Sequence, residues 1–115
     1  LAVAIGSAHG LYRGVPKIDI QRLRDIHAMV SIPLVLHGGS GTPDDIIKKC
    51  ISFGIAKINI ASELKYAFFR GIRDAFRNEP DVYEPRFFLA EAQRHARELI
   101  KEKFDLFGSA GRAGK

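Results

Sequence analysis

The chain has 115 residues, 46% of them hydrophobic, which suits one small packed domain and leaves little room for a second. Its 18 Lys and Arg residues against 13 Asp and Glu give a formal net charge of +5, which favours an anionic partner without deciding among nucleic acid, membrane surface and phosphorylated metabolites. No apolar run approaches the roughly 20 residues of a membrane-spanning helix, and the single cysteine, Cys50, cannot form an internal disulfide, so we expect a reducing, cytoplasmic location.

Strand-like and helix-like segments alternate along the chain. Residues 1–6 are almost all apolar, which predicts a strand covered on both faces, and the abrupt start suggests a piece cut from a longer protein. Helical spacing follows at 18–30, a strand at 31–39, a helix from about Thr42 to Gly54, a strand at 55–61, and helices at 62–80 and 85–107. Thr42 is well placed to cap its helix with its hydroxyl. Repeated strand–helix units are typical of a parallel α/β sheet.

Polar residues follow each predicted strand. His9 comes after the first strand, His37 ends the second, and Asn59 to Ser62 end the third. The C-terminal edge of the strands is where ligands gather in open α/β sheets and in (β/α) barrels. This edge is therefore the candidate site.

His9 and His37 are each followed by glycine, which leaves an imidazole uncovered and lets backbone approach a ligand. Neutral imidazole is a common zinc ligand, so one shared metal would explain both residues. The simpler interpretation is that each histidine hydrogen-bonds to a loop, and two ligands are fewer than the roughly three that a catalytic zinc takes.

The GGSG sequence at 38–41 has the composition of an anion-binding loop, since successive backbone N–H groups can converge on a phosphate where no β-carbon blocks the approach. Taken alone, such a sequence is more often a plain turn. The anion-binding interpretation is favoured because Asn59 to Ser62 lie just before a predicted helix, whose dipole also favours an anion.

Three motifs, AIGSAHGLY, PLVLHGGSG and AKINIASEL, occur in this order with separations that resemble the closing part of class II, zinc-dependent ketose-bisphosphate aldolases. The resemblance covers essentially the whole chain and is closest to the shorter branch of that family, because the longer, fructose-specific branch has an aspartate where this chain has Ala61. It implies a (β/α)8 TIM barrel whose enzymes cleave fructose or tagatose 1,6-bisphosphate to dihydroxyacetone phosphate and glyceraldehyde 3-phosphate.

The resemblance also implies roles for single positions. His9 and His37 match two zinc ligands, and Gly10 matches a substrate-contacting glycine. The remaining matches are to the loops that hold the phosphate of dihydroxyacetone phosphate, at Gly38, Gly39, Ser40, Asn59, Ile60, Ala61 and Ser62. The family commonly holds a sodium or potassium ion at these loops, and Lys65 could reach the distal phosphate, although a solvated surface lysine is the simpler interpretation.

The chain departs from the family pattern in one respect. The family's third zinc ligand and its catalytic aspartate belong to an Asp-His pair far upstream, and no such pair occurs here. We therefore expect residues 1–115 to be the C-terminal part of a single barrel domain, about its last three βα units. The isolated piece should fold poorly and lack activity without the N-terminal half, because three strands cannot close a barrel.

Further expectations concern partners and packing. The resemblance implies a homo-oligomer, a dimer or tetramer, that binds a phosphorylated sugar but neither nucleic acid nor membrane. Helical positions suggest that His27 and His95 are packing or surface residues, and that four aromatic side chains form core, at Tyr66, Phe68, Phe69 and Phe76. Two alternatives stay open: a phosphate-binding barrel of other chemistry without a metal, and a non-catalytic partner subunit.

Overall fold

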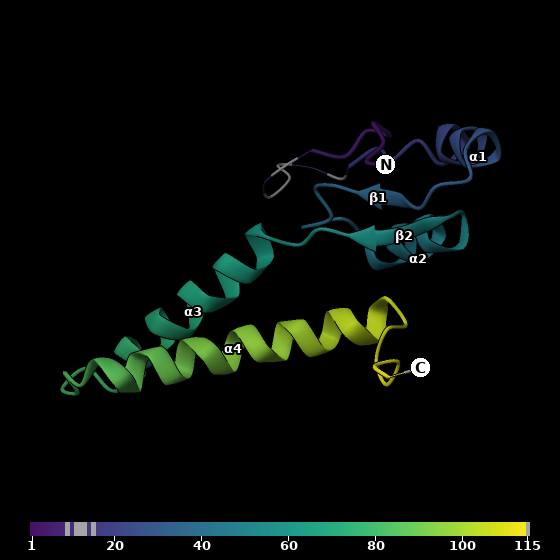
Figure 1. Cartoon of the computed structure of the whole chain (residues 1–115). Coiled ribbons are helices and arrows are strands. Elements are labelled where there is room, and N and C mark those ends of the chain that lie inside the picture. Colours follow the sequence, from purple (N-terminus) through teal and green to yellow (C-terminus); the bar gives the residue numbers. More distant parts are fainter. Residues whose placement is uncertain (9, 11–13, 15, 115) are drawn as a thin grey trace. The chain divides into compact units, whose positions relative to one another are not determined.

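The computed structural model describes residues 1–8, 10, 14 and 16–114, and the chain divides into two compact units. The first unit spans Leu1–Ser62 and the second spans Glu63–Lys115. Figure 1 shows the order of the elements, in which two helices and two strands alternate before a pair of long helices.

The first unit is an α/β layer in which each strand is preceded or followed by a helix. Its two strands pair in parallel, as predicted, with Val35 opposite Lys57 and Leu36 opposite Ile58. The elements, in chain order, are α1 (Ile20–Met29), β1 (Leu34–Leu36), α2 (Asp44–Ser52) and β2 (Ile55–Ile58). Parallel strands need a crossover between them, and α2 supplies it.

The strand predicted at 1–6 is only partly formed. Ala2 makes an isolated parallel bridge with Val35, and the Val35 N–H donates to the Leu1 carbonyl over 2.8 Å. Within the described residues this segment pairs with β1 on one side alone, so too few ladder hydrogen bonds form for a regular strand. The prediction of a third strand is wrong in extent, while its position beside β1 is as expected.

The core of the first unit is apolar and comes from every element. Ile5, Leu23, Leu34 and Leu36 are fully buried, and α2 contributes Ile47 and the equally buried Cys50. Burial raises the pKa of the Cys50 thiol, because an apolar surrounding disfavours the thiolate.

The ends of α1 and α2 are set by capping residues, except at the start of α2. The Asp19 side chain accepts a hydrogen bond from the Arg22 N–H at the start of α1, and Gly54 ends α2 with a φ of +102°. The predicted cap at Thr42 is wrong: α2 begins at Asp44 after Pro43, without a side-chain cap. Residue 42 lies one position too early, so its hydroxyl is buried in the loop instead.

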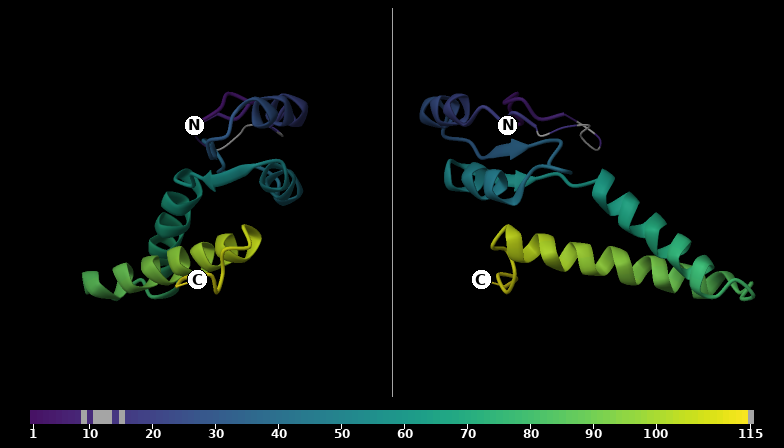
Figure 2. Two further views of the ribbon diagram at one scale, coloured as in Figure 1. Left: turned by 45° about the vertical axis from the view of Figure 1, so that its right-hand side comes forward. Right: turned by 180° about the vertical axis from the view of Figure 1, so that it is seen from behind.

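The second unit is a helical hairpin of α3 (Ser62–Asn78) and α4 (Pro85–Leu106), close to the predicted ranges (Figure 2). Glu63 and Lys103 form an ion pair of 2.7 Å with both side chains mostly buried. The rings of Phe76 and Phe88 stack with centroids 3.9 Å apart. At Gly71 the helices touch through backbone, since a β-carbon there would lie 2.7 Å from the Ala92 Cα.

The aromatic residues of α3 differ from the prediction. Tyr66, Phe69 and Phe76 are about half exposed, with 49%, 61% and 53% of their surface accessible, so their assignment to the core is wrong for this chain. Phe68 is partly buried. Phe76 stacks on Phe88 of α4 with one face of its ring and still keeps about half of its surface exposed, so contact with α4 alone does not bury the aromatic side chains of α3.

In the part of the chain that the structure describes, no helix has both the length and the apolar character needed to cross a membrane.

Replacement of Gly71 by alanine tests the backbone contact in the hairpin. Helix propensity alone predicts a gain of about 1 kcal/mol in the free energy of unfolding. We expect instead a loss of about 1–3 kcal/mol, because the new methyl group forces α3 and α4 apart. Ala90→Gly, on the exposed side of α4, is the matched control and should cost about 1 kcal/mol through propensity. Chemical denaturation of the intact protein measures both, and a stabilising Gly71→Ala would contradict the contact.

Candidate functional site

The candidate site lies where β1 and β2 end. Because the strands run parallel, the loop that begins at His37 and the loop from Asn59 to Ala61 leave the same edge of the sheet. The Asn59 N–H donates to the Leu36 carbonyl over 3.0 Å, which extends the pairing by one residue beyond β2. Both predicted loops therefore start side by side.

Two glycines let the backbone segments approach one another closely. Gly38 has a φ of +65°, and a β-carbon on it would collide with the carbonyl oxygen of Ala8. Gly39 donates its N–H to the Asn59 carbonyl over 3.2 Å, and a β-carbon there would lie 2.6 Å from the Ile58 side chain. Only glycine fits at these two positions, which bring three segments of the chain together.

Ser40 joins the two loops a second time. Its hydroxyl oxygen accepts a hydrogen bond of 3.3 Å from the Ala61 N–H, and its residue is 97% buried, with 3% of its surface accessible. Two backbone N–H groups, of Gly39 and Ala61, are thus directed at protein oxygens. The Gly39 N–H thus fastens the two loops, and the expected binding of an anion by the GGSG loop stays a prediction.

His37 is exposed at the end of β1 and contacts the second loop. Its Nδ1 atom lies 2.9 Å from Nδ2 of Asn59, and the Oδ1 atom of that amide accepts a hydrogen bond from the Lys57 ammonium. The imidazole is therefore held from the neighbouring strand.

The remaining predicted residues divide between described and undescribed positions. His9 lies outside the described residues. Gly10 has a φ of +102°, the Ile60 side chain lies near Gly39, and Ser62 is the first residue of α3. Lys65 is exposed in the first turn of α3. Among residues 1–8, 10, 14 and 16–114, no three His, Cys, Asp or Glu side chains gather as metal ligands would.

Comparison with known proteins shows which family the chain belongs to. The family model "Fructose-bisphosphate aldolase class-II" matches residues 1–112. The chain belongs to the class II fructose-bisphosphate aldolase family. Its α/β fold matches part of the family's (β/α)8 barrel, so the predicted family and fold class are confirmed.

Solved structures similar to the chain include aldolases from three organisms. The YdjI aldolase from Escherichia coli K12 is 38% identical with a TM-score of 0.79, over 97% of this chain and 40% of that one. A Coccidioides immitis protein, provisionally a fructose-1,6-biphosphate aldolase, is 29% identical with a TM-score of 0.83, over 97% and 39%. Fructose-bisphosphate aldolase from Campylobacter jejuni is 22% identical with a TM-score of 0.79, over 94% and 39%, and supports the fold alone. The chain thus spans about 40% of the length of these aldolases.

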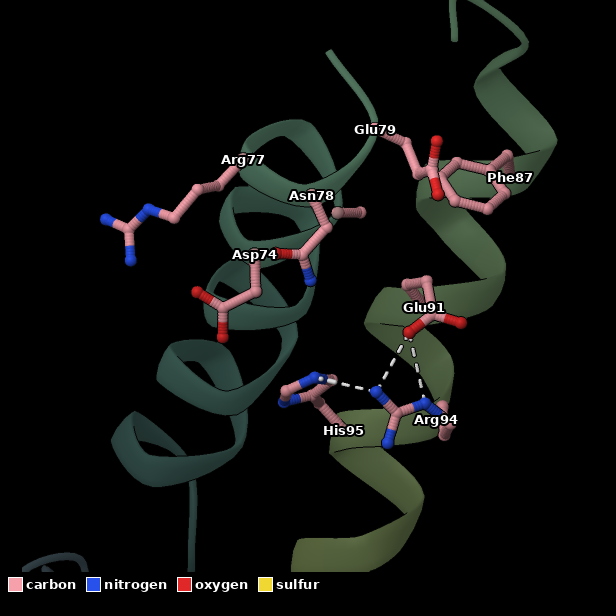
Figure 3. Close-up of a pocket in the computed structure, with 9 residues that line it drawn as sticks. Asp74, Arg77, Asn78, Glu79, Phe87, Glu91, Arg94 and His95 are labelled. Atoms are coloured by element: carbon pink, nitrogen blue, oxygen red, sulfur yellow. Dashed lines mark hydrogen bonds and ion pairs between the residues drawn. The ribbon is translucent and has the colours of Figure 1, made fainter.

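A hollow of about 550 Å³ lies between α3 and α4 and is lined mostly by charged and polar side chains (Figure 3). Arg94 forms ion pairs with Glu91 at 2.9 Å and Glu98 at 2.8 Å, and it donates to Nε2 of the half-buried His95. The two carboxylates raise the pKa of Arg94, chiefly through the Glu91 hydrogen bond. Arg94 is paired with two carboxylates of its own helix, and we assign this aldolase-family chain no ligand site in the hollow.

Sequence reasoning missed the position of Lys57 in the site. The signal was available, because residues two apart on a strand project from the same face, and Lys57 precedes Asn59 by two. A lysine within an apolar strand, beside a polar strand end, is the pattern that would have found it.

Replacement of Gly38 by alanine tests the packing of the glycine loop. A left-handed φ costs an alanine roughly 1–2 kcal/mol, and the collision with the Ala8 carbonyl adds to that cost. Gly108→Ala is the matched control, since Gly108 has a similar φ of +66° and open space around it. We expect Gly38→Ala to lower the free energy of unfolding by at least about 1 kcal/mol more than Gly108→Ala does, measured by urea denaturation. Equal costs would mean that the loop does not pack against Ala8.

Proposed function

We propose that this chain forms part of a zinc-dependent class II aldolase that reversibly cleaves a ketose 1,6-bisphosphate, fructose or tagatose, to dihydroxyacetone phosphate and glyceraldehyde 3-phosphate. One observation carries the proposal. His37, the GGSG loop and the Asn59–Ala61 loop are fastened together at one edge of the parallel sheet, by the Gly39–Asn59 and Ser40–Ala61 hydrogen bonds.

We assign zinc to His9 and His37. The two histidines fit a zinc site in part. His37 is an exposed imidazole at the end of a strand. Gly38, which follows it, packs against Ala8, and this contact brings the two histidine-bearing segments together. Zinc would act as a Lewis acid that stabilises the negative charge developing on the dihydroxyacetone phosphate half of the substrate. Two histidines leave a further ligand and the catalytic acid–base group to be supplied from another part of the protein.

The loops beside His37 are proposed to bind the substrate. Gly10 and Gly38 to Ser40 lie on one side, and Asn59, Ile60, Ala61 and Ser62 lie on the other. Ser62 opens α3, whose first N–H groups have no helical acceptor and carry the positive end of the helix dipole, so a phosphate here is favoured. A sodium or potassium ion at the backbone of these loops, and Lys65 at the distal phosphate, complete the proposed site.

The proposal extends to the whole protein. We infer that residues 1–115 are the C-terminal part of one (β/α)8 domain, that the N-terminal part supplies the missing ligand and carboxylate, and that the isolated chain is inactive. A cytoplasmic homo-oligomer is the proposed state. The half-exposed aromatic side chains of α3 support burial against further structure in the assembled protein.

Alanine substitution of His9 or His37 tests the metal assignment. In the intact protein, each change should lower the zinc content per subunit severalfold and reduce cleavage of both bisphosphates by at least about 10-fold, the smallest cost of losing even a residue that only supports a metal ligand. Elemental analysis and an assay coupled to dihydroxyacetone phosphate measure the two effects. His27→Ala, on the exposed side of α1, is the control and should keep full zinc. Undiminished activity of the wild type after chelation would exclude the zinc mechanism.

Ser40→Ala tests the phosphate loop. Loss of the hydroxyl removes the bond to the Ala61 N–H and loosens the joint between the two loops. We expect KM for the ketose bisphosphate to rise about 3- to 10-fold, in keeping with one hydrogen bond of about 1 kcal/mol. Ser52→Ala, which removes a helix-surface hydrogen bond to the Lys49 carbonyl, should leave KM unchanged. An unaltered KM in Ser40→Ala would show that this hydroxyl has no part in the substrate site.

A further inference from the structure

The exposed side chain of Lys57 is bound to a single neighbour in the candidate site. Its ammonium donates a hydrogen bond to Oδ1 of Asn59. Within the described residues, this ammonium forms no ion pair with a carboxylate and has no second hydrogen-bond partner. The polar group that Lys57 meets is therefore an amide of the proposed substrate loops.

The pairing of the strands explains why these two side chains meet. Ile55 and Lys57 lie two apart on β2 but oppose consecutive residues of β1, so the pairing contains a shift of one residue. In a regular strand, Lys57 would share the face of the buried Ile55. The shift turns Lys57 away from that face, and its ammonium reaches the Asn59 side chain at the end of the strand.

The main chain of Asn59 is fixed on both sides, so its side-chain amide is the polar group that remains. The Asn59 N–H donates to the Leu36 carbonyl over 3.0 Å, and its carbonyl accepts from the Gly39 N–H over 3.2 Å. Half a turn of the amide would exchange its oxygen and its NH2 group with little change in shape. What Asn59 presents to the loops therefore depends on which way the amide is turned.

Lys57 favours one of these two orientations. An ammonium group only donates, so the amide atom that faces it is the oxygen. The NH2 group is then directed to the side of the loop that begins at His37, whose ring lies 2.9 Å from Nδ2 of Asn59. Because a hydrogen bond from a charged donor is stronger than one between neutral groups, the reverse orientation is disfavoured.

The orientation of the amide matters for the proposed reaction. Phosphate and carbonyl oxygens of the dihydroxyacetone phosphate half only accept hydrogen bonds, and negative charge develops on one of its oxygens during cleavage. An NH2 group directed at such an oxygen stabilises the charge, whereas an amide oxygen in the same place would repel it. An amide that is already turned correctly needs no rearrangement when the substrate arrives.

We propose that Lys57 is a positioning residue, which holds the Asn59 amide with its NH2 group toward the substrate loops. Lys57 does not touch the substrate, and its effect passes through the amide. The inference rests on the proposed function, in which Asn59 belongs to the substrate site.

Substitutions at position 57 test this role in the intact, zinc-loaded protein. Lys57→Met removes the donor and should lower kcat about 10-fold, the equivalent of one hydrogen bond to a charged group, with a smaller change in KM. Lys57→Arg still only donates and should restore kcat to within about 2-fold of the wild type. Lys48→Met, on the exposed side of α2, removes the same charge elsewhere and should leave kcat unchanged. Wild-type kcat in Lys57→Met, or an equal loss in Lys57→Arg, would overturn the proposal.

A double-mutant cycle with Asn59→Ala separates positioning from a direct effect of the lysine charge. If Lys57 acts through the amide, Lys57→Met should have no further effect on kcat once residue 59 is alanine. An undiminished loss in that background would mean that Lys57 acts on the substrate itself, and the positioning role would be wrong.

The orientation is also measured without an activity assay, by nuclear Overhauser effects from the Asn59 NH2 protons in ¹⁵N-asparagine-labelled intact protein. Asn59→Ala assigns the signal. We expect stronger effects to the His37 ring than to the Lys57 side chain in the wild type, and a loss of this preference in Lys57→Met. Stronger effects to Lys57 in the wild type would overturn the proposal whether or not the protein is an aldolase. The expected orientation in a wild type that cleaves neither bisphosphate would instead contradict the proposed function, and with it the role of Lys57 in the reaction.

Discussion

Close backbone approach at two glycines is the constraint on which the candidate site depends. Gly38 packs against the carbonyl of Ala8, and Gly39 donates to the carbonyl of Asn59. A β-carbon at Gly38 would collide with the Ala8 carbonyl, and one at Gly39 would lie 2.6 Å from the Ile58 side chain, so the loop could not keep its present path. The close approach of the loops thus depends on two residues that have no side chain.

The same close approach means that some groups of the loops hold them together while others lie at the edge of the sheet. The N–H groups of Gly39 and Ala61 hold the loops together, while exposed His37 and the helix start at Ser62 remain at the edge of the sheet. A rigid joint of this kind suits a ligand or metal site, because a site must hold its groups in place before the ligand arrives. Membership of the class II aldolase family fits such an edge, since barrel enzymes of this fold class act at the C-terminal ends of their strands.

The helical hairpin combines a buried ion pair with exposed aromatic side chains. Gly71 allows backbone contact between α3 and α4, and the Glu63–Lys103 pair lies largely out of water. Yet Phe69 and Tyr66 on α3 stay about half exposed. The hairpin therefore buries one ion pair but leaves apolar surface that a larger assembly would cover.

The sequence by itself determined the order of elements, the parallel strands, the helix ends near Gly54 and Asn78, and the family, because periodicity, capping residues and motifs are local properties. It wrongly placed Thr42 at a helix cap, because a shift of one residue is enough to remove a cap. It also wrongly placed three aromatic residues in the core, because burial depends on neighbours that are distant in sequence. Only the tertiary structure decided which amides fasten the loops and that Asn59 lies against His37. Those contacts arise from strand register, and a shift of one residue reverses the face on which a side chain lies.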